Sequence, residues 1–182
     1  MAAPLAPHWP QPSHPSLLQV VHSCADPAAF ASKAVSAVSL PPGAVFAELT
    51  SPPLMVAQDA AYNTVQTAAA THVLLNSDLV YINHSCAPSL EFDVERMVLR
   101  VAAGKALRQG DELTYFYPST EWAMAQPFHC RCGAGAAVCR GWIVGAAQMP
   151  VEALHGYWIN AWIRDALLEK RTVEGAGGGG GV

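Results

Sequence analysis

The sequence is short of charge, of basic residues and of long apolar runs. Only 13% of its 182 residues are charged, and 10 Lys and Arg stand against 14 Asp and Glu, for a formal net charge of −4. The low charge and the 52% hydrophobic content exclude a wholly disordered chain. The acidic balance argues against a protein that coats nucleic acid, but it suits a basic substrate.

Signals for export and membrane insertion are also lacking. No run of about 18 apolar residues, the length that spans a bilayer, is present. The first basic residue is Lys33, whereas secretory and transit peptides carry basic residues near their start. We therefore expect a nuclear or cytoplasmic protein that has no membrane partner and does not bind nucleic acid directly.

Changes in composition divide the chain into five segments. Five prolines in the first segment exclude a helix there and predict a disordered arm. Glycines dominate the last segment and predict a disordered tail. The predicted segments are the Pro-rich arm 1–16, a main domain 17–120, a cysteine-containing segment 121–148, a helix 149–172 and the Gly-rich tail 173–182.

Local patterns predict short strands in the main domain and one helix after it. β-leaning stretches alternate with Pro and Gly turns, whereas two Ala-rich stretches favour short helices. The strands are expected at 20–21, 44–48, 97–101 and 113–117, and the short helices at 27–37 and 59–71. In the C-terminal helix, Leu154, Trp158 and Trp162 fall on one face, which indicates packing against the core.

Three motifs carry the chemical information: NHSCAPS at 83–89, GDELTYFY at 110–117 and CRCGAGAAVCRG at 130–141. Alone, the first two are typical of turns. In the third, Cys130, Cys132 and Cys139 supply three thiols, and clustered cysteines in a chain without a secretory signal indicate a metal site. Zinc takes four ligands in a structural site. His129 is one candidate for the fourth, although a surface position is the other interpretation.

In this order, the motifs resemble the SET-domain family of protein lysine methyltransferases, in its form with a post-SET zinc segment. The resemblance covers about residues 35 to 145. It includes the lead-in RMVLRVAAGKALRQGDEL at 96–113 and a remnant of the family's early glycine element, PPGAVFAE at 41–48. It implies a mainly β (α+β) fold of short sheets, a pseudoknot-like segment that brings NHSC beside the final strand, a post-SET zinc loop and a C-terminal helix.

The resemblance also implies a role for individual residues. Tyr117 takes the place of the catalytic tyrosine, and Tyr115 the position at which a hydroxyl limits the number of methyl groups added, which favours mono- or dimethylation. Phe116 stands where the family has Asp. The residues expected to hold S-adenosylmethionine are Gly43, Val45, Phe46, Asn83, His84 and Trp142. The expected zinc ligands are Cys86, Cys130, Cys132 and Cys139.

Three functional hypotheses follow. The first is an S-adenosylmethionine-dependent protein-lysine N-methyltransferase, acting as a monomer or homodimer on a protein or peptide lysine, with a histone as one candidate. The second is a catalytically degenerate SET-like module that still binds peptides. The third, a small zinc-stabilised structural protein, explains the cysteines but leaves NHSC and GDELTYFY without a role.

Overall fold

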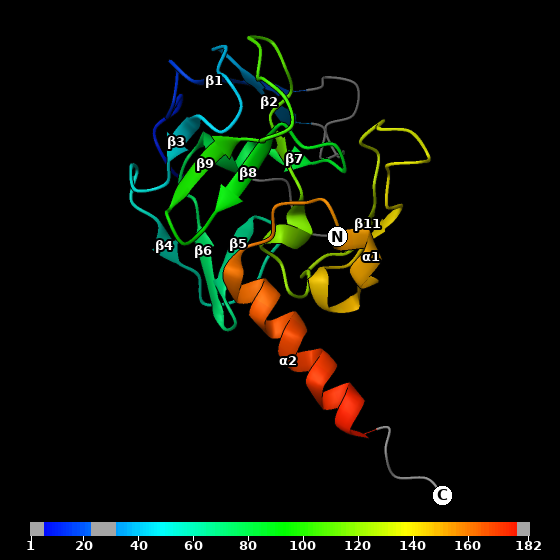
Figure 1. Cartoon of the computed structure of the whole chain (residues 1–182). Helices are drawn as coiled ribbons and strands as arrows, with labels where there is room; N and C mark the ends of the chain where they lie inside the picture. The colour runs from blue at the N-terminus through cyan, green and yellow to red at the C-terminus, as the bar shows by residue number, and fades with distance from the viewer. Residues whose placement is uncertain (1–5, 23–31, 178–182) are drawn as a thin grey trace, which may run out of the picture.

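Short β-strands are the main regular secondary structure of the protein (Figure 1). The computed structural model describes residues 6–22 and 32–177. In this part of the chain, twelve strands of two to five residues are joined by loops and three 3₁₀ turns, and two α-helices follow at the C-terminal end. No described helix is long and apolar enough to cross a membrane. The mainly β fold with a C-terminal helix is as predicted.

The strands form five small sheets. β1 (Leu18–His22) pairs with β2 (Ser32–Ser36), and β3 (Val45–Glu48), β9 (Val98–Val101) and β8 (Leu90–Asp93) form a three-stranded sheet in that order. β4 (Met55–Val56), β6 (Thr71–Leu74) and β5 (Thr64–Ala68) form a second one. β7 (Asn83–His84) pairs with β10 (Thr114–Tyr115), and β11 (Phe128–His129) with β12 (Trp142–Ile143).

The parallel pair β7–β10 places the first two motifs side by side. Asn83 is opposite Thr114 and His84 is opposite Tyr115. Parallel strands need a long crossover connection. The 29 residues between the two strands therefore lead the chain away from the end of β7 and back to the start of β10. The strands β8 and β9 lie in that crossover. The motif NHSC therefore lies beside the final strand, as the resemblance implies.

Two apolar clusters hold these sheets together. The larger one lies among the sheets and includes Phe92, Leu99 and Leu113, each at most 1% exposed. The smaller one joins the end of β10 to the C-terminal third of the chain and includes Phe116, Ile143 and Ile163. The cysteine-containing segment and the helices are thus anchored by a core of their own, next to the main one.

The described part of the predicted N-terminal arm is packed against the domain rather than disordered. Trp9 is only 7% exposed and belongs to the main core. Its indole Nε1 donates to Asp78 Oδ1 at 2.8 Å, and Gln11 and the Ser13 backbone N–H also donate to that carboxylate. A proline-rich segment cannot form a helix, but it can still pack against the domain through its other side chains. Residues 1–5 lie outside the described residues.

Tertiary pairing overrides the helical preference of the two Ala-rich stretches. Residues 32–36 form β2 and residues 64–68 form β5, where helices are predicted. In β2, Ala34 is fully buried and lies opposite Val20 of β1 in the hairpin. Strand pairing and burial outweigh intrinsic propensity here. The rest of the first predicted helix, at 27–31, lies outside the described residues.

The C-terminal helix is broken where the periodicity predicts a single helix. α1 (Val151–Leu154) ends at His155, and α2 (Ala161–Gly177) begins six residues later. Between them, Gly156 has φ +83°, and the fully buried Asn160 donates to the carbonyls of Phe92 and Ser119. These bonds hold the chain in a non-helical loop and attach it to the β domain.

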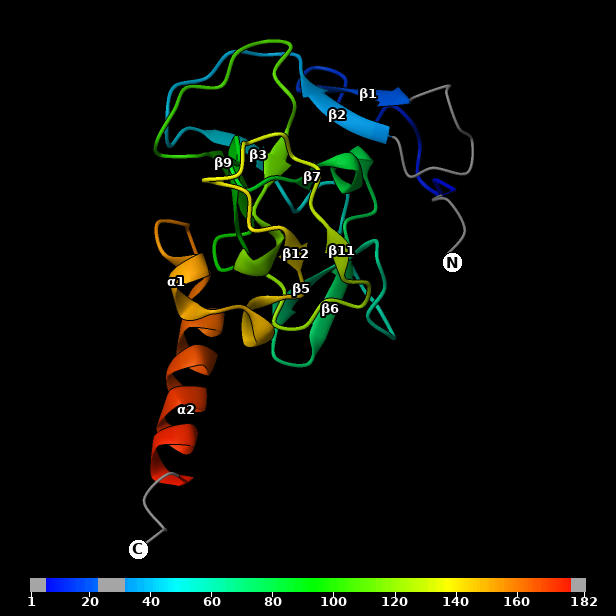
Figure 2. The ribbon, with the colours of Figure 1, turned by 90° about the vertical axis from the view of Figure 1, so that its right-hand side faces the viewer.

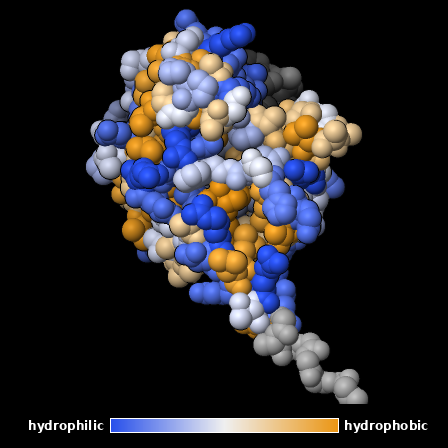
Figure 3. All heavy atoms as spheres, in the orientation of Figure 1, coloured by the Kyte–Doolittle hydropathy of each residue, from blue (hydrophilic) through white to orange (hydrophobic). Residues whose placement is uncertain are grey.

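α2 then extends away from the β domain, as Figures 1 and 2 both show. Its described course reaches Gly177, although a disordered tail is predicted from residue 173. Leu168 and Val173 are 60% and 72% exposed on it. Apolar surface also gathers around the start of this helix on the face shown in Figure 3.

Candidate active site

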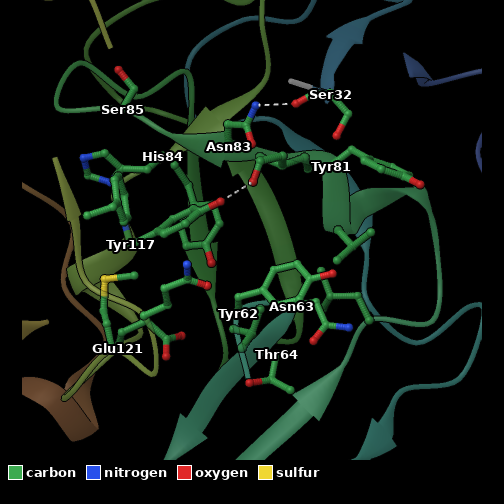
Figure 4. A pocket seen from close by; sticks show the side chains of 18 of the residues that line it. Ser32, Tyr62, Asn63, Thr64, Tyr81, Asn83, His84, Ser85, Tyr117 and Glu121 are labelled. Carbon is green, nitrogen blue, oxygen red and sulfur yellow. Dashed lines mark hydrogen bonds between the residues drawn. The ribbon is translucent and has the colours of Figure 1, made fainter. Parts of the chain in front are cut away.

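A cavity of about 730 Å³ opens beside the β7–β10 pair (Figure 4). This volume falls in the range of about 300 to 1,000 Å³ that is usual for small-molecule sites. Its described walls come from the ends of β1 and β2, the start of β5, the 3₁₀ turn Asp78–Tyr81, both strands of the parallel pair and the segment after β10. Five of the predicted site residues line it: Asn83, His84, Tyr115, Tyr117 and the predicted metal ligand Cys132.

The two predicted catalytic tyrosines lie together in this cavity. Their ring centroids are 4.7 Å apart, and the Tyr117 hydroxyl donates to the Ile82 carbonyl at 3.1 Å. Burial raises the pKa of both hydroxyls above their ordinary value, with a smaller contribution from the charge of Glu121. Both tyrosines therefore keep their protons at neutral pH. Tyr117 can orient a ligand through hydrogen bonds, but it does not act as a phenolate base.

His84 connects the tyrosine to the cysteine cluster. Burial lowers its pKa to about 4, so the ring is neutral. Its Nδ1 accepts the backbone N–H of Tyr117 at 3.2 Å, which assigns the ring proton to Nε2. Nε2 lies 3.4 Å from Cys86 Sγ and can donate to it. A donor at this place stabilises a thiolate, the form in which cysteine binds a metal.

Asn83 lies in the cavity wall, where its side chain joins two segments that are far apart in sequence. Its Nδ2 donates to the Ser32 carbonyl at 2.8 Å, as Figure 4 shows. Ser32 and His22, at the adjoining ends of β1 and β2, line the cavity as well. Sequence reasoning missed both residues, because a polar residue at a strand end carries no signal of its own.

The other predicted cofactor residues lie elsewhere. Gly43 is in the turn before β3, Val45 is 56% exposed on that strand, and Phe46 is buried in the main core. None of the three belongs to the described lining of the cavity. Their positions therefore do not support a contact with a cofactor bound there. The reason is that PPGAVFAE forms the strand that pairs with β9, whereas β1 and β2 reach the cavity.

Trp142 is next to the cavity rather than in it. It is 48% exposed on β12, and its ring packs against that of His129 with 4.5 Å between the centroids. His129 itself lines the cavity. Trp142 thus supports the wall through His129, for which the sequence left open a metal ligand or a surface residue; His129 is exposed in the structure.

The four predicted metal ligands meet in one cluster. The Sγ atoms of Cys86, Cys130, Cys132 and Cys139 all lie within 4.8 Å of one another. The Sγ atoms of Cys86 and Cys130 are 3.8 Å apart. Zinc–sulfur bonds of about 2.3 Å in a tetrahedron would hold sulfurs about 3.8 Å apart. The donor set and spacing therefore fit a structural zinc ion.

Phe116, which replaces the family's Asp, joins the parallel pair to the C-terminal segment. It is 2% exposed and stacks on Tyr157, with 3.8 Å between the centroids and an interplanar angle of 8°. Tyr157 in turn donates from its hydroxyl to the Cys86 carbonyl at 2.7 Å. The aromatic residue makes an apolar contact where a carboxylate would need a polar partner.

Glu121 is a second residue that sequence reasoning missed. It lines the cavity, is 7% exposed, and lies near Tyr117 in Figure 4. Its Oε1 accepts the backbone N–H of Gln66 at 2.9 Å and the hydroxyl of Thr120 at 3.0 Å. Burial raises its pKa to about 7. The one available signal was that it is the only acidic residue between Glu112 and Glu152.

These features define a mostly β protein with one tyrosine-lined cavity next to a four-thiol cluster. Residues 19–118 match the SET domain family. The chain is also 46% identical over 165 residues to "Methyltransferase flvH" of Aspergillus flavus, covering 91% of this chain and 89% of that protein. The chain belongs to the SET-domain family, and the relatives named as methyltransferases support a methyltransferase role for it.

Two further similarities cover a smaller share of this chain. The chain is 36% identical over 80 residues to "Histone-lysine N-methyltransferase ash1" of Drosophila melanogaster, which is 41% of this chain and 3% of that protein. A solved structure of KRYPTONITE in complex with mCHH DNA, an H3(1-15) peptide and SAH has 19% identity and a TM-score of 0.46. That similarity covers 69% of this chain and 29% of the other.

Proposed function

We propose that this protein is an S-adenosylmethionine-dependent protein-lysine N-methyltransferase. One observation carries the proposal: the parallel pair β7–β10 brings the NHSC motif and both tyrosines of GDELTYFY to one cavity. Membership of the SET-domain family and a relative named as a methyltransferase over most of its length support the same activity. Lysine as the acceptor follows from the resemblance of the motifs to the lysine methyltransferases.

The cavity suits the cofactor and the acceptor together. Its volume allows a nucleoside-sized ligand. We expect Asn83 and the backbone around His84 to hold the cofactor, with His22 and Ser32 beside them. When bound, S-adenosylmethionine supplies a methyl group on a positively charged sulfur.

The residues of the cavity prepare the acceptor amine. A lysine amine has a pKa near 10.4 in water and must lose a proton before it can attack. A narrow, buried site disfavours the charged form and lowers this pKa. The neutral hydroxyl of Tyr117 orients the amine by hydrogen bonding, and alignment supplies much of the rate enhancement. The hydroxyl of Tyr115, whose ring centroid lies 4.7 Å from that of Tyr117, favours the addition of one or two methyl groups.

A zinc ion on the four thiols would fix the post-SET segment. Cys86 comes from NHSC, whereas the other three cysteines come from the segment after β11. Phe128, His129 and Arg131 in that segment also line the cavity. The metal would therefore hold one wall of the cavity in place without taking part in the reaction.

The expected substrate is a basic segment of another protein. One relative is named as a histone-lysine methyltransferase, and the acidic net charge suits a basic peptide. A histone tail is therefore the first candidate, and another lysine-containing protein is the second. A nuclear or cytoplasmic location and a monomer or homodimer stay predictions.

The first test is calorimetric titration of the zinc-loaded full chain with S-adenosylmethionine. We expect micromolar binding, followed by transfer of a labelled methyl group to core histones or to lysine peptides in an array. Absence of binding at millimolar cofactor, with zinc present and the fold intact, would overturn the proposal. That result would favour the degenerate peptide-binding module.

A further inference from the structure

A buried acid lies in the cavity without a basic partner. Among the described residues, no Lys, Arg or His nitrogen lies within ion-pair distance of Glu121, whereas five other pairs are formed. Both recorded donors, Gln66 N and Thr120 Oγ1, meet the same oxygen, Oε1. Burying a carboxylate without a countercharge is costly, so such groups usually have a function or a partner.

The groups that face Glu121 do not neutralise it. Tyr115 and Tyr117 are neutral hydroxyls and supply no positive charge. Of the other basic and acidic groups that line the same cavity, Glu112 already pairs with Lys33 at 3.5 Å, which leaves His22 at the end of β1, His84 of β7, and His129 and Arg131 near β11. None of these four forms an ion pair with Glu121 among the described residues. Glu121 therefore has no countercharge in the described part of the cavity, and a cationic ligand beside it would favour the ionised carboxylate against the burial that raises its pKa.

We propose that the Glu121 carboxylate selects acceptors that enter the cavity as an ammonium ion. The ligand class is an alkyl amine, in which the positive nitrogen supplies the missing countercharge on entry, close to the two tyrosines. The amine becomes a nucleophile only after it has released that proton to solvent. Neutral acceptors of the same shape, such as alkyl chains or alcohols, would gain nothing from this contact. The inference rests on the proposed function, because it assigns the acceptor of that same site.

A purely structural role for Glu121 makes a different prediction. A glutamine side chain at position 121 can accept the same two hydrogen bonds through its own oxygen, so Glu121→Gln removes the charge and keeps the anchor. The neighbouring bond from Trp122 N to Gln66 Oε1 would also stay. If Glu121 only joins β5 to the end of β10, the glutamine variant should bind every ligand as the wild type does.

The test compares two capped amino acids that differ in one charge. The zinc-loaded full chain is titrated with Nα-acetyl-lysine methylamide and with Nα-acetyl-norleucine methylamide, and its amide NMR resonances are followed. We expect the wild type to bind the lysine probe at least about tenfold more tightly, a ratio typical of one charge-assisted contact. In Glu121→Gln this ratio should fall to about twofold or less. Glu152→Gln, the matched control with the same charge change at an exposed residue outside the described lining of the cavity, should keep the wild-type preference.

Each outcome decides the inference separately from the proposed function. An equal preference for the lysine probe in Glu121→Gln and in the wild type would overturn the inference about Glu121. The absence of binding of the lysine probe to the wild type at about 20 mM would overturn it too. Neither probe needs the methyl donor, so a failure of methyl transfer would overturn the proposed function without changing this result. Transfer by the wild type together with an unchanged Glu121→Gln ratio would overturn the inference alone.

Discussion

At the scale of the residue, the Tyr117 hydroxyl is the group on which the proposed reaction depends most. We expect Tyr117→Phe to lower turnover by at least about 100-fold, because the amine loses the group that orients it. Cofactor affinity should change little. The loss of the bond to the Ile82 carbonyl should cost about 1 kcal/mol of stability. Steady-state kinetics, calorimetry and urea denaturation measure the three quantities.

Tyr157→Phe is the matched control for this variant. It also removes a hydroxyl that donates to a backbone carbonyl, that of Cys86, and Tyr157 does not belong to the described lining of the cavity. A similar loss of stability with near-normal turnover is expected. If both variants lost turnover equally, the defect would come from the fold and not from the site.

Glu121 gives a second prediction, for stability against pH. Burial raises its pKa in the folded protein to about 7, above the ordinary value of 4.5. The folded state therefore keeps this proton over a range in which the unfolded chain has lost it, and stability falls as the pH rises from about 4.5 to about 7. Glu121→Gln escapes this penalty, so it should be more stable than the wild type by roughly 3 kcal/mol at about pH 8.

The measurement is urea denaturation of both zinc-loaded proteins between about pH 5.5 and about pH 8. The difference in unfolding free energy should widen with pH. A constant difference over this range would show that Glu121 is ionised throughout in the folded protein. A variant that gains stability but loses amine binding would show that the buried charge is kept for function.

Single residues were predictable from sequence where a motif fixed both identity and spacing. The four cysteines and the two tyrosines were found in this way, and the structure brings each set together. Gly43 and its neighbours were assigned through a partial motif, and they lie on another strand pair. Glu121 and Ser32 reach the cavity only through tertiary structure, which no local pattern encodes.

At the scale of the element, the N-terminal segment offers a test of its own. Trp9 is 7% exposed and bonded to Asp78, whose carboxylate accepts two further donors. We expect Trp9→Ala to destabilise the protein by about 3 kcal/mol, because it opens a cavity in the core and removes a donor from a buried carboxylate. Thermal and urea denaturation would measure this loss.

Trp142→Ala is the comparison, because this tryptophan is 48% exposed. It should cost less than half as much stability as Trp9→Ala. Equal losses would contradict the docking of the N-terminal segment and restore the prediction of a mobile arm. The five prolines do exclude a helix in this segment, as predicted. Proline content does not determine whether the other side chains of the segment pack into the core.

Elements were predictable where hydrophobic patterning and turns agreed. The strands near 44–48 and 97–101 appear as β3 and β9. The Ala-rich stretches became strands because their neighbours offer pairing partners, which a single stretch cannot reveal. The break between α1 and α2 depends on Asn160. Its side chain bonds the carbonyl of Ser119, 41 positions earlier in the chain, and that of Phe92, 68 positions earlier. Long-range contacts of this kind decide what local periodicity leaves open.

At the scale of the whole molecule, the cysteine cluster ties the parallel pair to the C-terminal segment. Cys86, which follows β7, is a buried member of the smaller core, and the other three cysteines pack against that core. His84 extends the link, since it meets Cys86 at one ring nitrogen and the Tyr117 backbone at the other. A change at the metal should therefore reach the cavity through the post-SET wall and through this histidine.

Zinc removal tests this coupling in the intact chain. A chelator should release one zinc ion per chain and weaken S-adenosylmethionine binding by at least about tenfold, because Phe128, His129 and Arg131 would no longer be held as one wall. Hydrogen exchange should rise at residues 128–142, while β3, β8 and β9 stay protected by the main core. Readdition of zinc should restore both. Unchanged cofactor binding in the zinc-free protein, with residues 128–142 still protected, would show that the smaller core alone holds the wall and that the four thiols are not needed for the site.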